Sequence, residues 1–180
     1  MDFKKFVDTS VGRANEDHQR FNRDEVINLY RTRVAEFFGR VENEWLSDYV
    51  NKGVTITSEE ITIFEERLGK YTVDSRIITI GCHKINLTPI GTILIGTPAR
   101  IDMEYGSSSA MFVMVGENIT CAGDQIEITT NGERARIRKE PGELVWKYVQ
   151  NNRQRNYVRV TADTFQKAIM SLIDDEESTD

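Results

Sequence analysis

The fold is decided by a stretch of short β-branched and aromatic runs that alternate with glycine, proline and polar residues, at positions 71–116: YTVDSRIITIGCHKINLTPIGTILIGTPARIDMEYGSSSAMFVMVG. Short runs with turn residues spaced about ten positions apart are typical of antiparallel strands joined by hairpins. The same pattern continues to residue 160. We predict strands at 72–80, 84–88, 92–96, 99–104, 111–116, 125–129, 133–139, 144–149 and 156–160.

A tight hairpin is predicted at the Asn-Gly pair at positions 131–132. Asn-Gly readily adopts the type I′ turn, whose twist matches that of the flanking strands. A two-residue loop would place Thr130 opposite Glu133 and Ile128 opposite Ala135. One face of this pair is then apolar and the other charged, as in a half-buried antiparallel sheet.

A long amphipathic helix is predicted over residues 22–52, before the strands. Asn22 is a favourable N-cap, and Glu25 stands three positions later, as in a capping box. Gly53 can adopt the left-handed conformation that ends a helix. Apolar residues recur in steps of three and four, which defines one helix face: Val26, Tyr30, Val34, Phe37, Val41, Trp45 and Tyr49.

Residues 58–69 fit two kinds of element. Ile61, Phe64 and Leu68 have helical spacing, whereas Ile61 and Ile63 by themselves would support a strand. We predict a short strand at 54–57 and a helix at 58–69.

The chain closes with a second amphipathic helix, which we predict over residues 161–173 with Thr161 as its N-cap. Residues 1–20 are predicted to be loosely ordered, and residues 174–180 to form a frayed acidic tail. We therefore expect a single α+β domain over 1–180, with a largely antiparallel sheet from about 54 to 160 packed by the two helices.

The composition is that of a globular protein, with 39% hydrophobic and 29% charged residues and a net charge of −6. No apolar stretch approaches the roughly 20 residues that span a bilayer, and the N-terminus has no apolar signal-peptide segment. The chain has two cysteines, Cys82 and Cys121. This number is too small for a disulfide framework, so we expect free thiols and a cytoplasmic location without a membrane role.

No complete catalytic or metal-binding motif is found. Residues 106–110 resemble a nucleophile elbow, but a predicted strand follows instead of a helix, so we expect a hairpin loop. Neither Cys-x-x-Cys nor a spaced histidine pair is present, and we predict no metal or other cofactor. The remaining enzyme hypothesis is a polar cluster of Asp102, Glu104 and His83. A cysteine nucleophile at Cys82 or Cys121, with His83 as its base, is a further alternative, although neither cysteine has a recognisable local signature.

The charge distribution carries the functional prediction. Residues 133–159 hold eight basic and three acidic side chains, while the whole chain is acidic. Alternate residues of a strand share one face, so Arg134, Arg136 and Arg138 should project together. We predict a non-catalytic interaction module of regulatory or immunity type, which binds an acidic protein partner through these arginines together with Arg153 and Arg155. Weak nucleic-acid binding through the same surface is an alternative.

Overall fold

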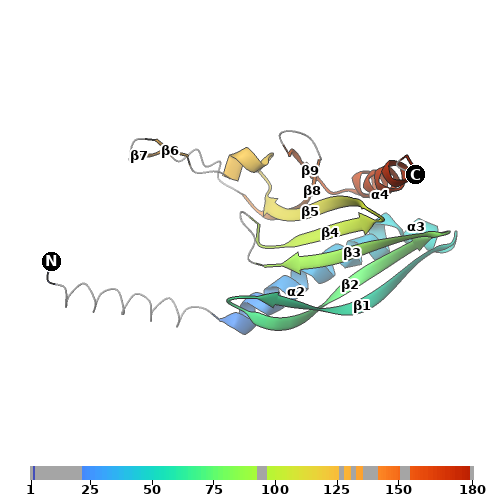
Figure 1. The fold of residues 1–180 in the computed structure, drawn as a ribbon, viewed down its shortest axis with the longest axis horizontal. Helices are drawn as coiled ribbons and strands as arrows, with labels where there is room; N and C mark the ends of the chain where they lie inside the picture. Colours follow the sequence, from blue (N-terminus) through green and yellow to red (C-terminus); the bar gives the residue numbers. More distant parts are fainter. Residues whose placement is uncertain are drawn as a thin grey trace.

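A seven-stranded antiparallel sheet with helices on one face forms the body of the computed structural model, which confirms the predicted α+β class (Figure 1). The structure describes residues 2, 22–92, 97–125, 128–130, 133–135, 142–150 and 155–178, without side chains at 125, 128–130 and 133–135. The elements in chain order are α2 (Arg23–Arg40), η1 (Val41–Trp45), α3 (Ser47–Val50), β1 (Val54–Glu65), β2 (Gly69–Ile80), β3 (His83–Gly91), β4 (Arg100–Tyr105), β5 (Ser108–Gly116), η2 (Ala122–Gln125), β6 (Ile128–Thr130), β7 (Glu133–Ala135), β8 (Leu144–Val149), β9 (Tyr157–Arg159) and α4 (Ala162–Glu177).

The strands follow one another across the sheet in the order β1-β2-β3-β4-β5-β8-β9, and β6 and β7 form a separate pair. Ile128 lies opposite Ala135 and Thr130 opposite Glu133, which confirms the predicted hairpin register. The turn at 131–132 and the continuation of both strands lie outside the described residues. So do 93–96 of the predicted strand 92–96 and the N-terminal segment apart from Asp2.

The predicted helix over 22–52 is confirmed from Arg23 to Trp45, but it is interrupted at Leu46 and continues only as the short α3, which ends at Val50. Asn22 caps it as expected, because its side chain accepts a hydrogen bond from the backbone N–H of Glu25 at 3.2 Å. The α-helix ends at Arg40, and a π-helical turn with one extra residue follows. Trp45 and Leu46 are both buried at the end of this turn.

The core lies between α2, α4 and the sheet, and Phe37 of α2 is at its centre. The ring centroid of Phe37 lies 4.9 Å from Trp146, 5.3 Å from Phe112 and 6.2 Å from Phe165. These partners come from β8, β5 and α4. One helical side chain therefore holds together elements that are distant in the chain.

The predicted helix at 58–69 is wrong, because β1 extends from Val54 to Glu65 and pairs with β2 over its whole length. Near the start of the hairpin the buried side chains are Val54 of β1 and Ile78 of β2, which lies opposite Ile56. Towards its tip the buried side chain is Ile63, which belongs to the opposite face of the strand. Two-stranded ribbons twist strongly, and the twist turns the second face towards α2.

The prediction of a frayed tail from residue 174 onwards is also wrong for residues 174–177, because α4 continues to Glu177. The Glu176 carboxylate accepts hydrogen bonds from the backbone N–H of Ser107 at 3.0 Å and from its hydroxyl at 2.9 Å. The turn between β4 and β5 therefore holds the end of the helix. Among the described helices, none is long and apolar enough to cross a membrane.

Candidate binding site on the open face of the sheet

The two faces of the sheet differ in what covers them. On β5, Phe112 and Met114 pack in the main core, whereas Val113 and Val115 belong to a second, smaller cluster on the other face. Both α2 and α4 contribute to the main core, and none of the described helices contributes to the second cluster. We call the face with the second cluster the open face.

A clamped ion pair lies on the open face of β4. The guanidinium of Arg100 donates to Asp102 through Nε and Nη2, with both distances at 2.6 Å. These hydrogen bonds raise the pKa of Arg100 above its ordinary value. The pair is bidentate, which is the strongest geometry for an arginine and a carboxylate. Asp102 is therefore engaged by its own strand.

Beside this pair is a cavity of about 140 Å³. Its lining includes the Arg100–Asp102 pair, the apolar side chains Met111 and Val149, and Arg155. Arg155 is exposed and adopts a φ of 47°, a left-handed backbone conformation that is uncommon for residues other than glycine. Within the described ranges, no carboxylate forms an ion pair with Arg155. The cavity therefore combines an apolar wall with a guanidinium that has no carboxylate partner among the described residues.

The predicted set of arginines is only partly visible. Arg155 is described in full and borders the cavity. Arg134 is described in its backbone and lies opposite Thr129, as the predicted register requires. Arg136, Arg138 and Arg153 lie outside the described residues, so the common face of Arg134, Arg136 and Arg138 remains a prediction.

Two further basic side chains of residues 133–159, those of Lys147 and Arg159, form contacts within the fold. Lys147 is buried, and its ammonium group donates to the backbone carbonyls of Glu117 at 2.7 Å and Ile119 at 2.6 Å. Burial lowers the pKa of Lys147. Arg159 pairs with the Glu117 carboxylate at 3.3 Å. These two side chains fasten the segment after β5, so the charge count of 133–159 overstates the cations that a partner could reach.

Sequence analysis did not select Arg100 as a binding residue. It alternates with the buried Ile101 on β4, and this pattern placed it on a polar strand face without indicating the nearby cavity. The cavity forms because the β4–β5 hairpin and the segment after β8 meet, and these two parts are far apart in the chain. No local signal could have shown this.

The predicted polar cluster of Asp102, Glu104 and His83 does not come together. Asp102 and Glu104 lie on the open face, whereas His83 alternates in phase with the buried Ile85 on the helix-covered face. The described part of the chain contains no group of three or more His, Cys, Asp or Glu side chains that could hold a metal. Residues 106–110 form the turn into β5 and the start of that strand, as predicted for a hairpin.

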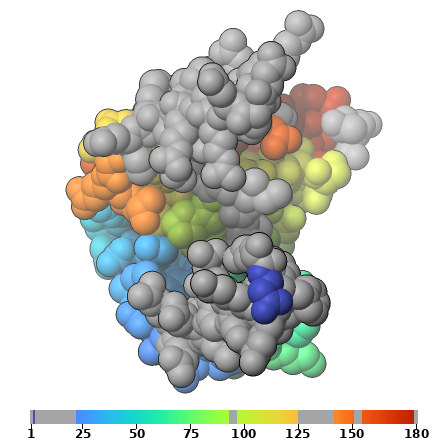
Figure 2. Space-filling view, turned by 90° about the vertical axis from the view of Figure 1, so that its left-hand side faces the viewer, coloured from blue at the N-terminus to red at the C-terminus, as the bar shows by residue number. Residues whose placement is uncertain are grey.

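A second concave region lies between α2 and the β1–β2 hairpin. Two adjoining cavities there, of about 390 and 470 Å³, share Arg31 and Thr72 in their linings. β2 pairs with β3 from Arg76 to Ile80, so residues 69–75 have an open edge, one with no partner strand among the described residues. Arg31 donates through Nε to the Thr72 carbonyl at 2.8 Å and satisfies part of this edge. Figure 2 shows α2 in blue at the lower left and this hairpin in green at the lower right.

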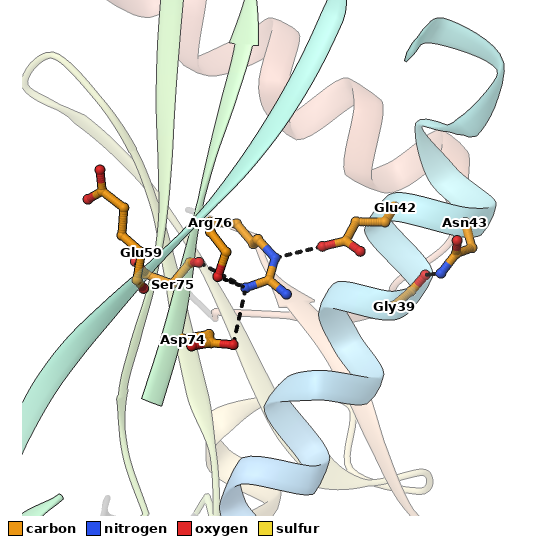
Figure 3. A network of polar contacts seen from close by, with 8 residues as sticks. Gly39, Glu42, Asn43, Glu59, Asp74, Ser75 and Arg76 are labelled. Carbon is orange, nitrogen blue, oxygen red and sulfur yellow. Dashed lines mark hydrogen bonds and ion pairs between the residues drawn. The ribbon is translucent and has the colours of Figure 1, made fainter. Parts of the chain in front are cut away.

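A network of polar contacts surrounds Arg76 in this region (Figure 3). Its guanidinium donates to the Glu42 carboxylate at 2.6 Å and to the Ser58 hydroxyl at 2.8 Å, and it lies 4.7 Å from the centroid of the Phe38 ring. Its side chain is only 15% exposed. Arg31 and Arg76 are thus held by hydrogen bonds within the fold.

Comparison with known proteins adds no assignment, because no family model, curated protein or solved structure matches this chain.

Proposed function

We propose that this protein is a non-catalytic interaction module of regulatory or immunity type that binds an acidic segment of a partner protein on the open face. The observation that carries the proposal is Arg155, which is exposed, has no carboxylate partner within the described part of the chain, and lines a cavity together with Arg100. The cytoplasmic location expected from the sequence belongs to the same proposal. Its support is that Cys82 and Cys121 are both free thiols.

The cavity suits a single acidic side chain. Its volume of about 140 Å³ is several times the ~30 Å³ share of one water molecule. A carboxylate placed there could accept hydrogen bonds from Arg155, while its methylene groups contact Met111 and Val149. The Arg100–Asp102 pair is already neutral as a unit, so Arg155 would supply the net charge.

Such a contact provides specificity for an anionic partner. Charge pairs at the rim of an interface mainly affect association rate and salt dependence, whereas desolvated ones affect dissociation. Arg155 borders a partly enclosed cavity and can be desolvated when a partner covers it. The predicted arginines at 134, 136, 138 and 153 would add long-range attraction.

The test is binding of a fluorescent Glu-rich peptide, measured by anisotropy at low and physiological salt. We expect Arg155→Glu to weaken binding by at least tenfold, because attraction is replaced by repulsion. The matched control is Arg40→Glu. Arg40 is also an exposed arginine, but it lies at the end of α2 in the helix layer. Equal binding by both variants would refute the open face as the site.

Nucleic-acid binding is distinguished in the same assay. A single-stranded oligonucleotide of matched charge should bind more weakly than the peptide. If it binds more tightly, with an affinity that falls steeply with salt concentration, the nucleic-acid alternative replaces the proposal.

A further inference from the structure

A thiol, an imidazole and a phenol lie together at the end of the sheet where β2 turns into β3. Cys82 is exposed in this turn, and its Sγ lies 3.7 Å from Nε2 of His83. Nδ1 of His83 lies 2.8 Å from the Tyr105 hydroxyl. The His83 and Tyr105 rings pack edge to face with centroids 5.5 Å apart. This cluster is independent of the open face and of the proposed function.

The order of the three groups is that of an activated nucleophile. A nucleophile is activated when a base lies within hydrogen-bond reach and a third group orients that base. When Nδ1–H of His83 donates to the Tyr105 oxygen, Nε2 carries a lone pair and can accept the thiol proton of Cys82. Tyr105 belongs to β4, so the fold and not the local sequence supplies the orienting group.

We propose that Cys82 is a reactive thiol that undergoes reversible exchange with low-molecular-weight disulfides, with His83 as its base and Tyr105 as a positioning residue. The proton passes from Cys82 Sγ to His83 Nε2, and the thiolate attacks one sulfur of the disulfide. A new S–S bond forms at Cys82 while the original S–S bond breaks. The departing sulfur leaves as a thiolate and takes up the proton, so no further oxidant is required.

The second cysteine provides an internal reference. Cys121 is half-buried, and its residue forms an isolated β-bridge with Asn156. Among the described contacts it has no histidine partner. Cys121 should therefore react slowly with the reagent that modifies Cys82.

The experiment follows modification of the full chain by glutathione disulfide, with each cysteine quantified by peptide mass spectrometry. We expect Cys82 to form the mixed disulfide at least tenfold faster than Cys121, and dithiothreitol to reverse it. A free peptide spanning residues 78–86 gives the rate that the local sequence alone produces. The folded protein should exceed that rate several-fold, because only the fold brings Tyr105 to His83.

Two variants distinguish the contribution of His83 as the base from that of Tyr105 as the positioning residue. His83→Gln should lower the Cys82 rate several-fold and shift its pH profile, while Tyr105→Phe keeps the ring and should lower the rate less. Circular dichroism confirms that each variant is folded. A Cys82 rate that is unchanged in His83→Gln, or one no higher than that of the free peptide, would overturn the proposal.

Discussion

Arginine side chains in two regions of this molecule differ in whether the protein itself supplies their hydrogen-bond partners. Between α2 and the β1–β2 hairpin, Arg76 and Arg31 donate to carboxylate, hydroxyl and carbonyl oxygens of the protein itself. Beside β8, Arg155 is exposed and has no carboxylate partner within the described ranges. The same residue type therefore serves the fold in one region and is available to a partner in the other.

Replacement of Arg76 should have the largest effect on stability. Arg76→Met removes the partners of Glu42 and Ser58 and the contact with the Phe38 ring. Loss of a mostly buried, charge-assisted network costs about 1–3 kcal/mol. Urea unfolding followed by circular dichroism measures the change. A free energy of unfolding equal to that of the parent would show that the network does not stabilise the fold.

Replacement of Arg31 should have a smaller and more local effect. Arg31→Met frees the Thr72 carbonyl on the open edge of β2, and an exposed hydrogen bond of this kind contributes up to about 1 kcal/mol. Hydrogen exchange should speed up in the hairpin around Thr72 and stay unchanged in β4 and β5. Arg40→Met is the matched control on the same helix, and an equal change in that variant would contradict the assignment.

Glu176 should make stability depend on acid. Hydrogen bonds from Ser107 lower the pKa of Glu176. The Glu176 carboxyl group therefore binds a proton less tightly in the folded state than in the unfolded state. The stabilisation is complete above the ordinary glutamate pKa and is lost as the pH falls through the lowered one. Glu176→Gln should therefore show a smaller decrease in melting temperature below about pH 4. An identical decrease in both proteins would contradict this linkage.

Replacement of Arg155 should have the smallest effect on stability. Exposed side chains without partners change the free energy of unfolding by no more than about 0.5 kcal/mol, so Arg155→Met should unfold like the parent. Together with Arg76→Met in the same urea assay, this variant compares an arginine that the fold holds by hydrogen bonds with an arginine that has no carboxylate partner among the described residues. A loss as large as that of Arg76→Met would mean that Arg155 is also held by the fold.

Local sequence patterns were sufficient to predict a helix cap or a strand register where the same face of the element stays buried along its length. The cap at Asn22, the cap at Thr161 and the register of Ile128 with Ala135 are all as predicted. The β1 strand was mispredicted because its buried face changes between Ile56 and Ile63. An alternating pattern interrupted by this change loses its period of two, and the remaining apolar residues resemble a helix.

The candidate site was less predictable than the fold. Arg155 was selected from its charge, but Arg100 was not, because its role depends on the cavity between strands. Lys147 was counted as part of the basic segment, although its ammonium group is buried and donates to Glu117 and Ile119. The sequence therefore gives the sign of the net charge of a segment, but not the number of charged side chains that a partner can reach.

Hydrophobic periodicity and capping act over a few neighbouring residues, so the α+β class, most of the strands and the two amphipathic helices follow from the amino-acid sequence. Which basic side chains have partners within the protein, and which polar side chains meet, depends on the tertiary fold. Thr72 is 41 positions from Arg31, and Glu42 is 34 from Arg76. Hydrogen-bond partners at such separations are set by how the chain returns on itself.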